Sequence, residues 1–256
     1  MTTGLSLDFD GKVALIVGAT GAIGARTARL FAQANAQLVL AGRDASKGAA
    51  LLAEVEKTGA EAMFVACDVT EAASMESVVA EAVGRFGRID CAFNNAGWEG
   101  AAVESAEITE NDWQRMIDIK LTGTWRGLKY QARQMLAQGG GGAIVNMAGS
   151  WGLVGFPRYA SYCAAAHGIM GLTRAAALEY AGAGIRINAV CPGAVDTPML
   201  DRMVGGNDEV KAAFASAIPM GRLAAPQDVS QAVVWLCSDL ASYVSGQGIV
   251  LTGAAQ

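Results

Sequence analysis

Short apolar runs alternate with amphipathic helical patterns along almost the whole chain, and this alternation constrains the fold more than any other feature. Each helical pattern lies between two apolar runs, so successive strands should run parallel with helices crossing between them. The sequence therefore predicts an α/β fold: a doubly wound, Rossmann-like parallel sheet in a single domain over residues 1–256. The predicted strands are Lys12–Val17, Gln37–Ala41, Ala62–Ala66, Ile89–Phe93, Ala143–Met147, Ile185–Val190 and Gly248–Leu251. The predicted helices are Ala22–Ala34, Ser46–Thr58, Glu71–Phe86, Glu110–Ala137, Tyr162–Tyr180 and Pro226–Cys237.

The amino-acid composition fits this fold and argues against some classes of binding partner. Of the 256 residues, 52% are hydrophobic and 17% are charged, as expected for strands buried on both faces. A net charge of -5 argues against nucleic-acid binding. The chain opens without a basic, apolar leader, and the uncharged stretch 138–157 is too glycine-rich and polar to cross a membrane. We therefore expect a small-molecule substrate and no nucleic-acid or membrane partner.

Cysteines and loops give two further expectations. The five cysteines form no C-x-x-C pair and accompany no histidine cluster, so we expect reduced thiols, no metal site and a cytoplasmic setting. The least regular stretch of the sequence is 196–219, which carries Pro198, Gly205, Gly206 and Pro219. Because long loops in compact domains are often functional, this stretch is interpreted as a lid, with a plain connection as the alternative.

A glycine-rich turn, Gly18-Ala19-Thr20-Gly21-Ala22-Ile23-Gly24, follows the first predicted strand and opens the first predicted helix. Glycines let the backbone approach a pyrophosphate, and the helix N-terminus stabilises its charge. The turn resembles the T-G-x-x-x-G-x-G motif of the short-chain dehydrogenase/reductase family, with Val17 in place of the threonine and Ala22 in place of the middle glycine. The added methyl group of Ala22 could crowd a cofactor, unless Gly21 relieves the backbone.

Three more segments carry the resemblance across about residues 8–256. Asp68-Val69 ends the third strand, where that family contacts adenine, and Asn94-Asn95-Ala96-Gly97 matches its N-N-A-G. The segment 191–197 resembles its P-G-x-x-x-T, which lies beside the nicotinamide amide. The resemblance implies an NAD(P)-dependent oxidoreductase and a homotetramer in which the two long helices 110–137 and 162–180 pair across subunits. The cofactor-binding residues that it implies are Gly18, Thr20, Ile23, Gly24, Arg43, Asp68, Val69, Asn95, Ala96, Gly97, Tyr162, Pro192, Gly193, Val195 and Thr197.

The end of the second strand favours NADP(H) over NAD(H). A carboxylate there would accept a hydrogen bond from a ribose 2′-hydroxyl and repel a 2′-phosphate. Gly42 occupies the place where NAD-preferring members of the family carry an aspartate, and Arg43 follows it. A guanidinium can bind phosphate through a fork of donors. The alternative is that Arg43 only faces solvent, which leaves NAD(H) open.

The catalytic positions depart from the family pattern. The family uses a tyrosine as acid/base, a lysine four residues later, a serine thirteen residues before the tyrosine, and an asparagine that supports a proton relay. Tyr162 matches the tyrosine, but Ala166 stands at the lysine position, Gly149 at the serine position and Lys120 at the asparagine position. Ser150 is the neighbour of Gly149, although successive strand residues point to opposite faces. One of four catalytic groups is therefore kept.

Lys120 allows several interpretations. Its stem could carry the amine to solvent. Alternatively, it points into the space left by the missing side chains and supplies a relocated positive charge beside Tyr162, which keeps hydride chemistry. A desolvated lysine can also attack carbonyl carbons, so Lys120 with Tyr162 would suit non-redox Schiff-base or retro-aldol chemistry. A cofactor-binding protein with little activity also remains open. Small residues at 149 and 166 are compatible with natural drift or with deliberate truncation.

Apolar and aromatic residues should gather where the strands end, because ligands of open α/β sheets bind beyond those carboxyl ends. Core packing is the alternative for some of them. We expect an apolar or aromatic ketone or alcohol as substrate. The predicted substrate pocket comprises Trp98, Gly149, Ser150, Trp151, Tyr159 and Met199, with Leu153, Phe156, Leu200 and Met203 nearby.

Overall fold

A seven-stranded, wholly parallel sheet forms the centre of the computed structural model, which describes residues 7–255. The strands lie in the order β3-β2-β1-β4-β5-β6-β7. The chain order reverses direction between β1 and β4, which is where such sheets bind ligands. The strands are β1 Val13–Val17, β2 Gln37–Gly42, β3 Ala62–Ala66, β4 Cys91–Asn94, β5 Gly142–Met147, β6 Ile185–Pro192 and β7 Gly248–Leu251.

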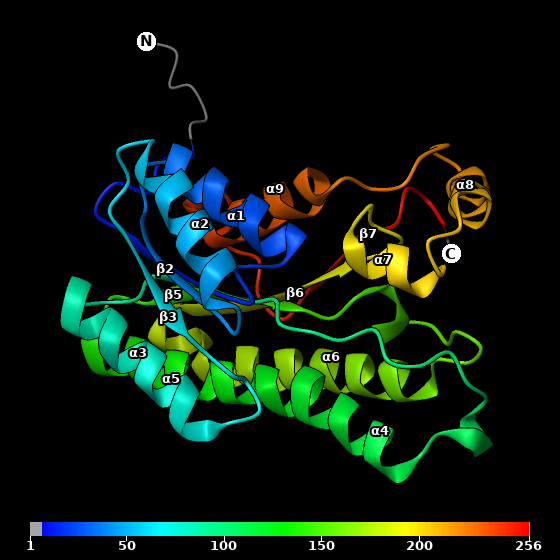
Figure 1. The fold of residues 1–256 in the computed structure, drawn as a ribbon. Helices are drawn as coiled ribbons and strands as arrows, with labels where there is room; N and C mark the ends of the chain where they lie inside the picture. The colour runs from blue at the N-terminus through cyan, green and yellow to red at the C-terminus, as the bar shows by residue number, and fades with distance from the viewer. Residues whose placement is uncertain (1–6, 256) are drawn as a thin grey trace.

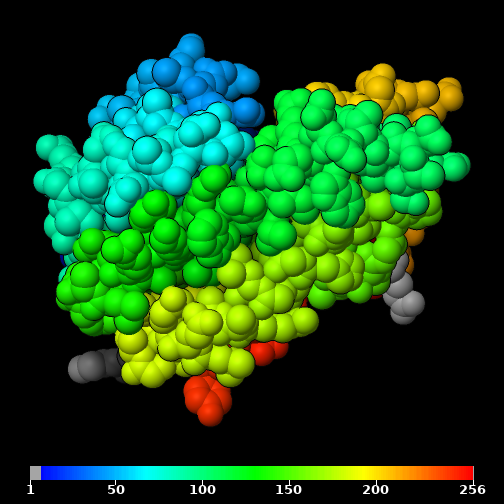
Figure 2. Space-filling model, turned by 90° about the horizontal axis from the view of Figure 1, so that it is seen from below, coloured from blue at the N-terminus to red at the C-terminus, as the bar shows by residue number. Residues whose placement is uncertain are grey.

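Helices cover both faces of the sheet, so the predicted doubly wound fold is confirmed. In Figure 1, α1, α2 and α9 lie above the sheet, and α3, α5 and α6 lie below it. Figure 2 views the molecule from below, where side chains of α3 (cyan), α4 and α5 (green) and α6 (yellow-green) form the surface. These helices are α1 Ala22–Gln33, α2 Ala45–Glu56, α3 Ala72–Phe86, α4 Glu110–Met116, α5 Gly123–Gln138, α6 Ala160–Tyr180 and α9 Pro226–Cys237.

The two layers of core follow from the strand period of two. In β1, Ala14 and Ile16 pack into the cluster under α1 and α9, whereas Val13, Leu15 and Val17 pack into the cluster under α3 and α5. All five residues are buried. A strand buried on both sides must be apolar at every position, which is why it reads as a continuous apolar run.

The long helix predicted at Glu110–Ala137 is interrupted, which the sequence analysis missed. It begins as predicted at Thr109, whose hydroxyl accepts a hydrogen bond from the amide of Asp112. A π-helical turn, η2 (Ile117–Thr122), then separates α4 from α5. Such turns are rare and are frequent at functional sites. Here the π turn contains Lys120.

The stretch 196–219 is more regular than predicted. It holds two helices, α7 (Pro198–Met203) and α8 (Asp208–Ala217). Side-chain caps start both, because Thr197 accepts from the amide of Leu200 and Asn207 accepts from two amides of the first turn of α8. Pro198 and the glycines, which suggested irregularity, lie at the first turn of α7 and between the helices. In Figure 1, α7 and α8 project beyond the end of the sheet.

Three general features concern the described residues 7–255. Their helices include none with the length and apolar character that a membrane crossing requires. All five cysteines are free thiols, and four of them are buried. No group of three or more potential metal-ligating side chains occurs in this part of the chain.

Candidate active site

A cavity of about 790 Å³ opens at the carboxyl ends of the strands and brings together nearly all the residues predicted for the site. Its walls include every predicted cofactor-binding residue except Gly24, and every predicted substrate-pocket residue. Both predicted catalytic side chains, Tyr162 and Lys120, also line it. Leu153, by contrast, is 37% exposed and does not line the cavity. These walls come from the segments that follow all seven strands, and from the π-helical turn, α6, α7 and α8.

The glycine-rich turn has the shape that a pyrophosphate needs. Gly18 has φ +80°, and a β-carbon there would lie 2.7 Å from the backbone nitrogen of Ala96. A β-carbon at Gly24 would lie 2.3 Å from the carbonyl oxygen of Gly18, so Gly24 serves close packing of α1 rather than ligand contact. Gly21 stands at the N-cap of α1 in an extended conformation with no side chain in front of the helix. The residues present therefore fit a dinucleotide phosphate at this N-terminus.

A side-chain amide fixes the turn to the neighbouring strand. The Nδ2 of Asn95 donates a hydrogen bond of 3.1 Å to the carbonyl oxygen of Gly18. The loop at the third strand is held in a similar way, because the guanidinium of Arg126 donates to the carbonyl oxygen of Val69 at 3.0 Å. Hydrogen bonds from polar side chains thus hold the cavity walls near the point where the strand order changes direction.

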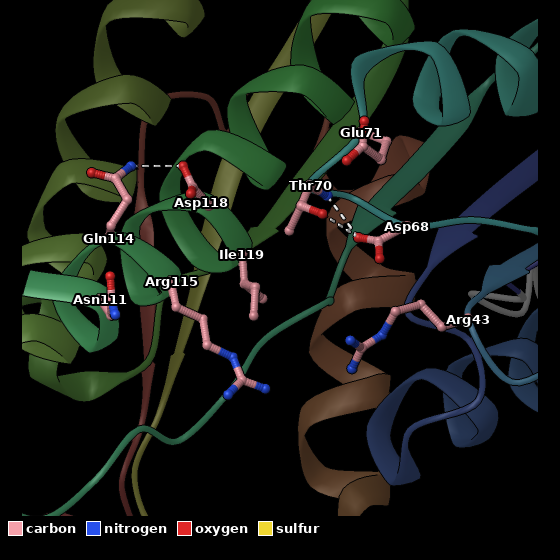
Figure 3. A pocket seen from close by; sticks show the side chains of 9 residues that line it. All are labelled: Arg43, Asp68, Thr70, Glu71, Asn111, Gln114, Arg115, Asp118 and Ile119. Atoms are coloured by element: carbon pink, nitrogen blue, oxygen red, sulfur yellow. Dashed lines mark hydrogen bonds between the residues drawn. The ribbon is translucent and has the colours of Figure 1, made fainter.

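Arg43 and Asp68 face the end of this cavity and also line a second hollow of about 500 Å³ (Figure 3). Burial raises the pKa of Asp68, but hydrogen bonds from Thr70 and the positive charge of Arg43 outweigh burial, so the net pKa lies below its ordinary value. Arg43 is exposed, and among residues 7–255 it forms no ion pair within 4.0 Å. Its guanidinium is available for an anion at this end of the cavity.

Tyr162 lies at the start of α6, within a group of aromatic rings. The ring of Trp151 packs edge-on against Tyr162, with 5.3 Å between centroids. Trp151 also stacks on Phe156 at 4.2 Å and contacts Tyr159 at 4.9 Å. Burial raises the pKa of Tyr159, which keeps that phenol protonated. This group makes one wall of the cavity apolar and aromatic.

Lys120 points inward, so the interpretation that its amine reaches solvent is wrong. The residue is 2% exposed. Its Nζ lies over the face of the Tyr162 ring, 4.2 Å from the centroid, and donates a long hydrogen bond of 3.4 Å to the carbonyl oxygen of Met147. Among residues 7–255, no carboxylate lies within 4.0 Å of this amine. The structure therefore brings a buried amine and a phenol together.

The serine position is reshaped around its glycine. Gly149 has φ +88° and ψ 157°, a backbone region that is essentially restricted to glycine. A β-carbon there would lie 3.0 Å from the hydroxyl oxygen of Tyr162. Ser150 begins the short helix η3 (Ser150–Gly152) and lines the cavity. Ala166 is fully buried one turn beyond Tyr162 in α6.

An ion pair connects α7 to the rim of the cavity. The guanidinium of Arg202 donates to the carboxylate of Glu99 at 2.5 and 3.1 Å, and Glu99 is 8% exposed. Burial raises the pKa of Glu99, but the hydrogen bonds and charge of Arg202 outweigh burial and hold the net pKa below its ordinary value. Asp196, at the start of the segment, is bound by Lys211 of α8 at 2.6 Å. Arg202 therefore holds α7 to the rim of the cavity, and Lys211 holds α8 to the start of the segment.

Several lining residues were not predicted from the sequence. Lys47 and Met147 stand near the cofactor and catalytic ends, and α8 contributes apolar side chains. The capping residues of α7 and α8 could have shown that the segment forms helices, and an apolar helix face would then have pointed to the cavity. Among the additional residues are Val154, Val210, Phe214, Ala217 and Ile218.

Comparisons with known proteins agree with this geometry. The family model described as enoyl-(acyl carrier protein) reductase matches residues 18–253. The chain is 37% identical to 2,5-dichloro-2,5-cyclohexadiene-1,4-diol dehydrogenase of Sphingobium indicum over 246 residues, 96% of this chain and 97% of that protein. It is 39% identical to cyclohexanol dehydrogenase of an Acinetobacter strain, covering 98% of this chain and 97% of that protein. The crystal structure of levodione reductase superposes with a TM-score of 0.91 at 36% identity, covering 96% of this chain and 97% of that one.

The parallel sheet, the glycine-rich turn and the tyrosine in the cavity define a dinucleotide-binding oxidoreductase. The chain belongs to the short-chain dehydrogenase/reductase family, as the resemblance in its motifs implied.

Proposed function

We propose that this protein is an NADP(H)-preferring oxidoreductase that interconverts an apolar cyclic alcohol and its ketone. The observation that carries the proposal is the single cavity in which a dinucleotide cradle, Tyr162 and Lys120 meet. Relatives named for cyclohexanol and for a chlorinated cyclohexadienediol support a ring substrate. The stacked aromatic wall formed by Trp151, Phe156 and Tyr159 supports the same class.

When bound, the nicotinamide would supply or accept the hydride. The protein must move the accompanying proton and stabilise charge on the substrate oxygen. Tyr162 carries the proton, because its hydroxyl lies on the cavity wall next to Gly149, the position of the family's serine. The ammonium of Lys120, over the ring face, stabilises the phenolate that forms when the proton leaves. In this way Lys120 would take over the positive charge that Ala166 lacks.

NADP(H) preference rests on the second strand. No carboxylate side chain exists at Gly42, and the free guanidinium of Arg43 follows directly. A 2′-phosphate beside this guanidinium would form charge-assisted hydrogen bonds. NAD(H) lacks that phosphate and would gain nothing from Arg43.

The segment 196–219 is proposed as a lid. Met199, Leu200 and Met203 of α7 and Phe214 of α8 face the cavity, so displacement of these helices would open it to water. Exclusion of water would strengthen the interaction between Lys120 and a developing phenolate.

A homotetramer and a cytoplasmic setting complete the proposal. Exposed apolar side chains on α4, α5 and α6 support association through helices: Trp113 is 41% exposed, Trp125 44% and Leu178 86%. Sedimentation analysis would reveal a lasting monomer if association is wrong. The five free thiols support a reducing compartment.

The proposal is tested by binding and turnover together. Trp98 and Trp151 line the cavity, so NADPH should quench tryptophan fluorescence on binding. Turnover is followed as NADPH oxidation with a panel of ring ketones, for the unaltered protein and for Tyr162→Phe, which should lose roughly 100-fold or more. Binding without turnover of any ketone would indicate a cofactor-binding protein with little activity. Absence of binding to either nucleotide would exclude the oxidoreductase.

A further inference from the structure

The amine of Lys120 has surroundings that hydride chemistry does not require. It is enclosed by the cavity wall, and its described polar contact is a single long hydrogen bond to the backbone of Met147. Buried ammonium groups are normally paired with carboxylates because desolvation is costly, yet residues 7–255 place none within 4.0 Å. An amine with few hydrogen bonds keeps its lone pair accessible once the proton is gone.

A phenol stands beside this amine, because Nζ lies over the face of the Tyr162 ring and both side chains line the cavity. A tyrosine hydroxyl can donate a proton and can accept one as phenolate. With the proton on nitrogen, the pair is phenolate and ammonium, which suits hydride transfer. With the proton on oxygen, the pair is phenol and amine, which combines a proton donor with a nucleophile. The distance of 4.2 Å joins Nζ to the centroid of the Tyr162 ring, so both side chains stand at the same part of the cavity wall.

Cys191, a potential competing nucleophile, is inactive at this site. It is fully buried, and burial raises the pKa of its thiol to about 11 against the lowering effect of the Lys120 charge. A thiol that keeps its proton is a poor nucleophile. Lys47, the other lysine on the cavity wall, lies on α2 and has a side chain that is 71% exposed. The cavity thus offers one enclosed amine.

We propose that Lys120 forms an imine with aldehydes and ketones in this cavity, without a nicotinamide cofactor. The Nζ lone pair attacks the carbonyl carbon while Tyr162 donates its proton to the carbonyl oxygen, which gives a carbinolamine. The carbinolamine then loses its hydroxyl group and the nitrogen proton as water, so one amine and one carbonyl give one imine and one water. Atoms balance, and no oxidant or reductant is needed.

The class of substrate follows from the imine. A β-hydroxy ketone bound in this way can break its Cα–Cβ bond: the bond electrons move toward the iminium nitrogen and leave an enamine. The β-hydroxyl proton passes to the Tyr162 phenolate, and the released fragment is an aldehyde or ketone. Protonation and hydrolysis of the enamine then free the amine. The inference is a retro-aldol activity that goes beyond the proposed hydride transfer.

Reductive trapping tests the imine. The full chain, without nucleotide, is incubated with cyclohexanone and sodium cyanoborohydride, and peptide mass spectrometry locates the cyclohexyl group. We expect labelling of the peptide that contains Lys120 at least tenfold faster than labelling of surface lysines. Lys120→Arg keeps a positive charge and should lose this label completely. Lys47→Ala is the matched control and should keep it.

Two further measurements distinguish imine formation from the proposed function. Tyr162→Phe should slow trapping by roughly 100-fold, because the proton donor is removed. Release of acetone from diacetone alcohol, a β-hydroxy ketone, should disappear in Lys120→Arg. The inference is overturned if Lys120 is labelled no faster than surface lysines. It is also overturned if the corresponding peptide of Lys120→Arg carries as much cyclohexyl label as that of the unaltered protein. NADPH binding is measured separately, so either proposal can fail alone.

Discussion

The carboxylate of Glu99 accepts two hydrogen bonds from Arg202, and these bonds join the loop after β4 to α7. Glu99 is nearly buried, whereas the side chain of Arg202 is 59% exposed. The contact is therefore formed at the surface end of the cavity, between the wall of the dinucleotide cradle and the segment proposed as a lid.

Acid should weaken this contact. The pKa of Glu99 in the folded protein lies below its ordinary value, so the pair stabilises the fold above the unfolded-state pKa and is lost as pH falls through the folded pKa. Glu99→Gln should lower the free energy of unfolding at pH 7 by about 1 kcal/mol, with the difference shrinking below about pH 4. Urea unfolding at both pH values measures it. A difference that grows on acidification would contradict this assignment.

Lys120→Met should separate activity from stability. Methionine has similar length and removes a buried charge that lacks a carboxylate partner, so the free energy of unfolding should stay level or rise by about 1 kcal/mol. Turnover should fall roughly 100-fold, because the phenolate of Tyr162 loses its nearby positive charge. Urea titration and steady-state kinetics check both. A large loss of stability would show that Lys120 serves packing instead.

Arg43→Ala should affect one nucleotide selectively. Loss of charge-assisted hydrogen bonds to a 2′-phosphate should weaken NADPH binding roughly tenfold or more, while NADH binding changes little. Arg85→Ala is the matched control, because Arg85 is an exposed arginine in the last turn of α3, outside the cavity. Equal weakening for both nucleotides would point to a general effect of charge or folding.

Gly149→Ser should not restore the family's serine function. The backbone at Gly149 has φ +88° and ψ 157°, where a side chain costs roughly 1–3 kcal/mol, and the added carbon meets the Tyr162 hydroxyl. We expect lower stability and no gain in turnover. Gly155→Ser is the control on the same loop: φ there is not positive, and nothing lies within 4 Å of an added carbon. A Gly149→Ser protein with full stability and faster ketone reduction would show that the loop can relax.

Much of this architecture follows from the sequence because burial on both faces leaves a clear apolar run for each strand, as in Val13–Val17. The dinucleotide-binding site could also be predicted from the sequence, since Gly18 and Asn95 belong to short motifs that are recognised without knowledge of the fold. The proximity of Lys120 to Tyr162 was one of several hypotheses from the sequence, because both residues stand at catalytic positions of the family motifs.

Other features depend on packing and left little trace in the sequence. The turn at Ile117–Thr122 contains no glycine or proline that would mark a break in a helix, and it lies in contact with α4, α5 and α6. The conformation of Gly149 could not be predicted either, because glycine is compatible with every backbone region. For α7 and α8 the sequence holds a helix signal in the capping residues Thr197 and Asn207, but the neighbouring prolines and glycines are equally typical of a loop.

The π turn determines which relatives of this protein can share the geometry of Lys120. Such a turn holds one residue more than an α-helical turn, so the direction of Lys120 depends on how many residues the chain has there as well as on which they are. Loss of a single codon between 117 and 122 would let the helix rewind, rotating the amine away from the cavity without changing it. In family members with a lysine at this position but a helix one residue shorter, the lysine would therefore point in another direction and could not take the same role.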